Sequence, residues 1–135
     1  LQFLSSFLFS LPYLTPTEEA RVLAMDDGIS RSISFLRDNL CENLQLRDLA
    51  KASGYSLSRF KSKFRTETGI TPAEYIALQK IEYAKQQLTN TDISITDLAY
   101  SLGFSSSNYF STVFKKYNES TPREYRSMQA SNHSA

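Results

Sequence analysis

Small polar and basic side chains recur at the same spacing in two stretches of the chain, and these side chains could bind nucleic acid. The first stretch carries Ser58, Lys61, Ser62 and Arg65. The second stretch carries Asn108, Ser111, Thr112 and Lys115. Residues three, four and seven positions apart share one face of a helix, and side chains of these types hydrogen-bond to base edges in the DNA major groove. The solvated side of an ordinary amphipathic helix is the alternative interpretation.

Further basic residues flank the two faces, where DNA phosphates would lie. They are Arg59, Lys63 and Lys116. Lys115, at the end of the second face, is also assigned to a phosphate contact. The distribution of charge agrees with this assignment, because residues 1–50 have a net charge of −3 whereas residues 51–135 have +4. The formal net charge of the whole chain, +1, does not by itself indicate a nucleic-acid partner, and ordinary surface charge is the alternative.

Both stretches belong to a unit that occurs twice in the chain. From Leu49, and again from Leu98, the chain carries Leu-Ala, a glycine followed by an aromatic residue and a serine, two phenylalanines four apart, and Thr-Pro-x-Glu-Tyr. The second copy has one inserted residue before its phenylalanines. A single polar stripe favours the solvated-face interpretation, but its duplication within one small chain favours DNA binding.

Each copy has the pattern of a helix-turn-helix motif. Gly54 and Gly103 are predicted to end the first helix of each copy with a positive φ. Ser56 and Ser105 are predicted to cap the second helix. The phenylalanines of that second helix share one face and should be buried. They are Phe60 and Phe64 in the first copy and Phe110 and Phe114 in the second.

The hydrophobic periodicity predicts an all-α fold. A first helix over residues 26–40 should pack behind the first motif. The remaining predicted helices cover residues 46–53, 56–68, 71–88, 94–102, 105–117 and 121–128. The helix over residues 71–88 should be about 25 Å long at 1.5 Å per residue. Such a rod could hold two recognition helices roughly one DNA turn, about 34 Å, apart, so that both enter successive major grooves.

The two ends of the chain have a different character. Residues 1–14 are strongly apolar, but the run is too short to span a bilayer and lacks the features of a secretory signal. We expect it to be the last helix of a preceding domain, or a linker helix that packs on a partner. Residues 15–25 should add a short linker helix that starts at Pro16. Residues 129–135 are predicted to be a disordered polar tail.

Residues that commonly carry catalysis are scarce. The only cysteine, Cys41, cannot form an internal disulfide; it is predicted to be partly buried, in a reduced cytoplasmic protein. The only histidine, His133, lies in the polar tail. No catalytic triad, metal-ligand spacing or phosphate-binding glycine loop is present in the sequence. The sequence therefore predicts no enzyme, cofactor, metal site or membrane span.

Residues from about 29 to 126 resemble the DNA-binding domain of the AraC/XylS family of bacterial transcription regulators. In the first copy the resemblance is carried by L-x-D-L-A-x-x-S-G-Y-S and F-x-x-x-F-R-x-x-T-G-I-T-P-x-E-Y. In the second it is carried by I-x-D-L-A-x-x-x-G-F, Y-F-S-x-x-F-K-K-Y and T-P-x-E-Y-R. The resemblance implies seven helices in two helix-turn-helix subdomains joined by a long central helix, together with an N-terminal linker helix.

A domain organisation follows from the resemblance. Residues 1–25 would be a linker or the tail of an N-terminal effector-binding and dimerisation domain, and residues 26–128 would be the DNA-binding domain. Within that domain the first subdomain, the connecting helix and the second subdomain would cover residues 26–70, 71–90 and 91–128. The partners expected are double-stranded DNA, RNA polymerase, and a second copy through the N-terminal domain.

The family's base-reading positions can be carried over residue by residue. They fall on Ser58, Lys61 and Ser62 in the first copy, and on Ser107, Asn108, Ser111 and Thr112 in the second. This chain departs from the family pattern at three positions. Lys80 stands where Arg is frequent, which predicts a weaker bidentate contact. Thr112 also stands where a long Arg is common, which predicts that the second recognition helix contributes less affinity than the first. Glu119 stands where a glycine usually ends the second recognition helix, so it must adopt a left-handed conformation or end the helix differently.

The function predicted from these features is that of a sequence-specific transcription regulator, with an activator role and a cytoplasmic location. It would place two recognition helices in adjacent major grooves of double-stranded DNA. An enzyme and a helical protein-interaction module are the alternatives. An assay panel for hydrolase or transferase activity tests the first. DNA binding that persists after charge reversal at Lys61, Lys63 and Arg65 would favour the second.

Overall fold

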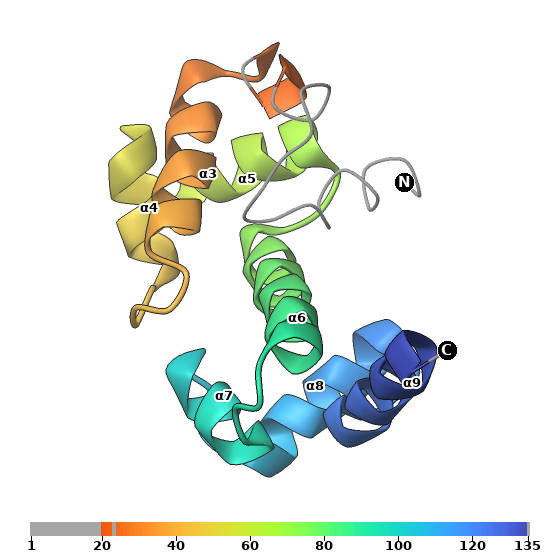
Figure 1. The fold of residues 1–135 in the computed structure, drawn as a ribbon. Coiled ribbons are helices and arrows are strands. Elements are labelled where there is room, and N and C mark those ends of the chain that lie inside the picture. Colours follow the sequence, from red (N-terminus) through yellow and green to blue (C-terminus); the bar gives the residue numbers. More distant parts are fainter. Residues whose placement is uncertain (1–19, 23, 135) are drawn as a thin grey trace. The chain divides into compact units, whose positions relative to one another are not determined.

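The computed structural model describes residues 20–22 and 24–134, and from Asp27 onward these residues form helices joined by short turns (Figure 1). The helices are α3 (Asp27–Asp38), α4 (Leu46–Ser53), α5 (Leu57–Thr68), α6 (Pro72–Asn90), α7 (Ile95–Ser101), α8 (Ser107–Asn118) and α9 (Pro122–Ser134). No strand occurs in this part of the chain, so the predicted all-α fold is confirmed. None of the described helices is both long and apolar enough to span a bilayer.

The predictions for the N-terminal residues fall largely outside this range. The apolar segment 1–14 and the start of the linker helix lie outside the described residues. Residues 20–22 and 24 are helical. The chain divides into two compact units, the first ending at Gln79 and the second beginning at Lys80, so the boundary falls within α6.

The first unit has its core between α3, α4, α5 and the start of α6. The apolar residues of α3 that are no more than 1% exposed are Ile29, Ile33 and Leu36. Phe60 and Phe64 of α5 are equally buried, with ring centroids 5.5 Å apart. The Phe64 ring also meets the edge of Tyr75, at 5.2 Å between centroids. The predicted inward face of the first recognition helix is therefore confirmed.

A close approach between α3 and the turn after α4 requires a glycine at position 28. A Cβ added to Gly28 would lie 2.6 Å from the backbone oxygen of Ser53 and 2.7 Å from Cε2 of Tyr55. The guanidinium of Arg31, one turn along α3, donates to the same Ser53 oxygen at 2.9 Å. Because this oxygen belongs to the last turn of α4, the positive charge is favourable there.

The second unit has its core between the C-terminal half of α6 and helices α7, α8 and α9. Its buried residues are Ile81, Ala84, Leu88, Leu98, Ala99, Leu102, Phe110 and Phe114. The rings of Phe110 and Phe114 are 5.9 Å apart, and Phe114 meets Tyr125 of α9 at 5.6 Å. Tyr125 is thus the counterpart of Tyr75, and it packs against the core of the second unit.

Arg126 of α9 holds the end of α6. Its Nε donates to the backbone oxygen of Leu88, and its second guanidinium nitrogen donates to that of Thr91, both at 3.2 Å. Carbonyl groups at a helix C-terminus lack partners within the helix, and a cation is favoured there. Arg126 therefore ties α9 to the C-terminal end of α6 within the second unit.

The structure corrects three predictions. Ser106, and not Ser105, caps α8, because the inserted residue of the second copy lies before the cap. Cys41 is exposed, since α3 ends at Asp38 and Cys41 lies in the turn that follows. The helix α9 continues to Ser134 where a disordered tail is predicted. The segment after Met128 lacks Pro and Gly and includes the good helix formers Gln and Ala, so little opposes the extension.

Candidate nucleic-acid interface

The ends of α5 are set by its own residues. The hydroxyl of Ser56 accepts a hydrogen bond from the backbone N–H of Arg59 at 3.3 Å, as an N-cap should. At the other end Gly69 has a φ of 85°, the left-handed conformation that closes a helix. Between them Phe60, Phe64 and Thr68 are buried, which fixes the rotation of α5 about its axis and leaves the opposite face in solvent.

The four predicted base-reading residues of the first copy occupy this opposite face. Ser58, Lys61, Ser62 and Arg65 are all exposed. Lys61, Ser62 and Arg65 line a groove of about 440 Å³, together with Leu46 and residues 71–73. The structure thus brings three of the four predicted side chains into one groove, which Ser58 does not line, and adds the starts of α4 and α6 to their surroundings. The repeat pattern gave no signal for Leu46, because its packing depends on tertiary proximity.

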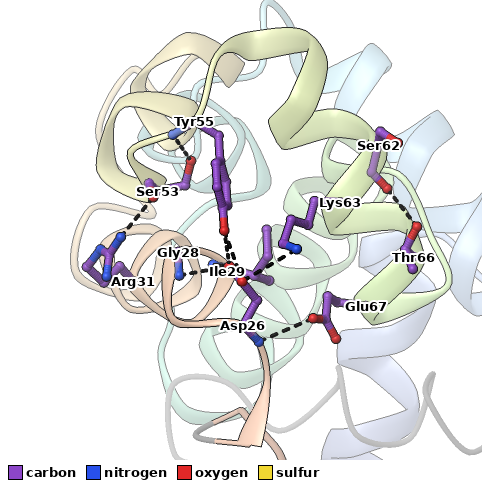
Figure 2. Close-up of polar contacts among 10 residues, drawn as sticks. All are labelled: Asp26, Gly28, Ile29, Arg31, Ser53, Tyr55, Ser62, Lys63, Thr66 and Glu67. Atoms are coloured by element: carbon purple, nitrogen blue, oxygen red, sulfur yellow. Dashed lines mark hydrogen bonds and ion pairs between the residues drawn. The ribbon is translucent and has the colours of Figure 1, made fainter.

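The two side chains of α5 that are predicted to bind phosphate contact a tyrosine, and one of them also pairs with an aspartate. The guanidinium of Arg59 lies 5.4 Å from the centroid of the Tyr55 ring, and the ammonium of Lys63 lies 5.8 Å from the same centroid. Lys63 is half-buried, and its Nζ is 3.6 Å from Oδ1 of Asp26 (Figure 2). Lys63 is therefore already paired within the first unit, whereas Arg59 is exposed.

Asp26 is the N-cap of α3 and the centre of a polar cluster (Figure 2). Its Oδ2 accepts hydrogen bonds from the backbone N–H groups of Gly28 at 3.0 Å and Ile29 at 3.3 Å. The Tyr55 hydroxyl donates to the carboxylate, at 2.7 Å to Oδ2 and 2.9 Å to Oδ1. This hydroxyl is the largest cause that lowers the pKa of Asp26, and the same bond raises the pKa of Tyr55. The backbone N–H of Asp26 donates to Glu67 of α5 at 3.3 Å.

The second recognition helix, α8, has the same plan. Ser106 accepts from the backbone N–H of Tyr109 at 3.0 Å, and Phe110 and Phe114 are buried. The predicted base-reading residues of this copy lie on the other side: Asn108 and Thr112 are exposed, and Ser107 and Ser111 are partly exposed. The Thr112 hydroxyl donates to the backbone oxygen of Asn108 at 3.0 Å, so its methyl group is the part best suited to a base contact.

Two features distinguish the surface of α8 from that of α5. Lys115 and Lys116 are exposed, but both lie in the last turn of the helix. Near the start of the helix, Tyr109 is 56% exposed, and its ring packs on Phe104 at 5.9 Å between centroids. Tyr109 precedes Phe110 as Arg59 precedes Phe60, so the repeat register could have identified it as a surface residue of the reader.

Glu119 ends α8 in the left-handed conformation, with a φ of 63°. It is the only non-glycine residue with a positive φ in the described part of the chain. The first of the two alternatives predicted for Glu119 is therefore confirmed. Such a conformation costs a residue with a Cβ about 1–2 kcal/mol relative to the right-handed one.

The comparison with known families agrees with this geometry. A family model described as a helix-turn-helix domain matches residues 49–128, which include both motifs. The chain therefore belongs to this family of helix-turn-helix domains. Within that class it is a DNA-binding domain of the AraC/XylS type, as the motifs predicted.

Individual relatives support the same placement. The xylose operon regulatory protein of Escherichia coli strain K12 is 30% identical over 105 residues, which are 78% of this chain and 27% of that protein. A crystal structure of a transcriptional regulator with an AraC-type DNA-binding domain, from Chromobacterium violaceum, is 26% identical with a TM-score of 0.71, covering 86% of this chain and 97% of that one. The DNA-binding domain of AdpA, solved with a target DNA, is 24% identical with a TM-score of 0.75, covering 79% and 96%, and shares the fold.

Proposed function

We propose that this chain is the sequence-reading part of a transcription regulator, and that α5 and α8 each enter a major groove of double-stranded DNA. One observation carries the proposal. In both copies a serine-capped helix buries two phenylalanines and turns a polar or basic face to solvent. A helix can occupy the major groove with such a face toward the base edges.

The roles of individual residues follow from their exposure. We propose that the exposed or partly exposed side chains of the two outer faces read bases, and that the flanking cations bind phosphates. The base readers would be Ser58, Lys61, Ser62, Arg65, Ser107, Asn108, Ser111 and Thr112. The phosphate contacts would be Arg59, Lys63, Lys115 and Lys116. On DNA, the 19 residues of α6, about 28 Å at 1.5 Å per residue, would space the readers for adjacent grooves.

The known relatives support the DNA-binding part of this proposal. The chain spans about a quarter of the length of the xylose operon regulatory protein. We propose that a longer form of this protein binds RNA polymerase, forms a dimer through an additional domain, and acts as an activator in the cytoplasm. We propose no enzymatic activity, because the chain matches a helix-turn-helix family model and resembles an AraC-type DNA-binding domain.

Selection of bound sequences from a random duplex pool tests the proposal. The expected result is an enriched site of roughly 20 base pairs with two half-motifs whose centres are about one helical turn apart. No enrichment over the starting pool would contradict sequence-specific binding. A single short motif would contradict the use of both helices.

A further inference from the structure

Lys63 lies directly beside the reading face of α5. Arg59, Ser62, Lys63 and Thr66 line one shallow depression of about 220 Å³, and Ser62 also lines the groove that contains Lys61 and Arg65. The two surfaces therefore meet at Ser62. A DNA backbone that borders the reading face of α5 would pass within reach of the Lys63 ammonium, because a Lys side chain has a flexible four-carbon stem.

The carboxylate that pairs with Lys63 is held by other groups. Asp26 accepts hydrogen bonds from Gly28, Ile29 and Tyr55, while Lys63 adds an ion pair at 3.6 Å. The backbone N–H of Asp26 is bonded to Glu67. These bonds keep the carboxylate in place when Lys63 moves away. The Lys63 ammonium, in contrast, can pair either with this fixed carboxylate or with a phosphate.

We propose that Asp26 is a positioning residue that competes with DNA phosphate for Lys63 and thereby sets how much of the positive charge of α5 is available to DNA. This inference rests on the proposed DNA-binding function. Asp26 and Lys63 are partly exposed, at 21% and 32% of their side chains. Exposed pairs of this kind change an equilibrium constant by only about 1.4- to 5-fold, so a phosphate can displace Asp26 at a small cost in affinity.

The test replaces Asp26 by neutral residues that still cap a helix. Asp26→Asn and Asp26→Ser keep an N-cap oxygen for α3 and remove the negative charge. Asp27→Asn is the matched control, because Asp27 is the exposed neighbour in α3 and its replacement changes the net charge equally. Binding to a labelled random-sequence duplex of about 25 base pairs is measured by fluorescence anisotropy from about 50 to 200 mM salt. Helix content is checked by circular dichroism.

Both Asp26 variants should bind about 2- to 5-fold more tightly than wild type at the lowest salt. The slope of log affinity against log salt should become steeper by up to about 0.9, the value of one additional phosphate contact. Asp27→Asn should have a clearly smaller effect, because its charge lies farther from the ammonium and is screened. In a Lys63→Gln background, Asp26→Asn should act no differently from Asp27→Asn.

Three results would overturn the inference alone: Asp26 variants that match Asp27→Asn, folded Asp26 variants that bind more weakly than wild type, or a gain that persists without Lys63. The first would show that the pair does not limit DNA binding. The second would show that Asp26 supports α5 only through its hydrogen bonds. If wild type itself bound no duplex at low salt, the proposed function would fail, and this inference with it.

Discussion

The two recognition helices each bury a pair of phenylalanines at equivalent positions, but they differ in the charge on their exposed surfaces. Four of the seven residues from 59 to 65 in α5 are basic, whereas α8 has its two lysines only in its last turn. Tyr55 binds the Asp26 carboxylate through its hydroxyl, whereas its counterpart Phe104 has no hydroxyl and packs against Tyr109 and the ammonium of Lys80, 5.5 Å away. We infer from the comparison that the first copy supplies most of the electrostatic attraction to DNA.

The largest expected effect concerns the buried phenylalanines that the two copies share. Phe64→Ala and Phe114→Ala each empty a fully buried site and should lower the free energy of unfolding by about 3–5 kcal/mol. Urea unfolding followed by circular dichroism measures the loss. Because the two rings occupy equivalent positions, the losses should be similar. If either variant lost less than about 1 kcal/mol in its free energy of unfolding, the two phenylalanine sites would not be equivalent.

The difference in DNA contacts should appear in specificity. Lys61→Ala should remove about 1–3 kcal/mol of discrimination between the selected site and random duplex, while Thr112→Ala should remove less. Lys63→Ala should weaken binding to both duplexes equally. Anisotropy titrations with the two duplexes measure these changes. Equal losses on both duplexes for Lys61→Ala would exclude a base-reading role for Lys61.

The helix ends provide a smaller effect of opposite sign in the two copies. Glu119→Gly relieves a left-handed residue with a Cβ and should stabilise the second unit by about 1 kcal/mol. Gly69→Ala introduces the same conflict in the first unit and should destabilise it by about 1–2 kcal/mol. Thermal unfolding of the two variants beside wild type checks both signs. A destabilised Glu119→Gly would show that the Glu119 side chain contributes contacts that outweigh its backbone strain.

The smallest effect is a dependence on pH that comes from Asp26 in the first unit. The pKa of Asp26 is lowered from its ordinary value of 3.8, so its charged form stabilises the folded state above pH 3.8. This contribution is lost as the pH falls through the lowered pKa. The stability difference between wild type and Asp26→Asn should therefore be present at pH 6 and shrink as the pH falls below 3.8. A difference that stays constant over this range would contradict a charge-based role for Asp26.

The parts of the fold that were predictable are those encoded by short spacings. The glycines at positions 54 and 103 have φ values of 83° and 82°, as expected from their place two residues before a potential cap. The phenylalanine pairs are buried because residues four apart share a helix face. The approximate positions of the helices follow from the same local signals, although the start of α8 and the ends of α3 and α9 do not. The resemblance of the motifs identified the fold.

Contacts between residues distant in sequence were not predictable. Lys63 pairs with Asp26 across 37 positions, and Arg126 bonds to Leu88 across 38. The sequence shows the charge of each residue but not the carbonyl or carboxylate that the fold brings beside it. The burial of Cys41 was predicted wrongly for a related reason. The helical spacing of apolar residues continues past Asp38 in the sequence, but α3 ends at Asp38 and Cys41 is exposed.

The most direct test of the central claim is guanine N7 methylation protection on the selected duplex. If α5 and α8 enter adjacent major grooves, bound protein should protect two clusters of guanines about 10 base pairs apart on one face of the duplex. Lys61→Ala should weaken the protection in one cluster only. A single protected cluster, or two clusters on opposite faces, would contradict reading of DNA by both helices together.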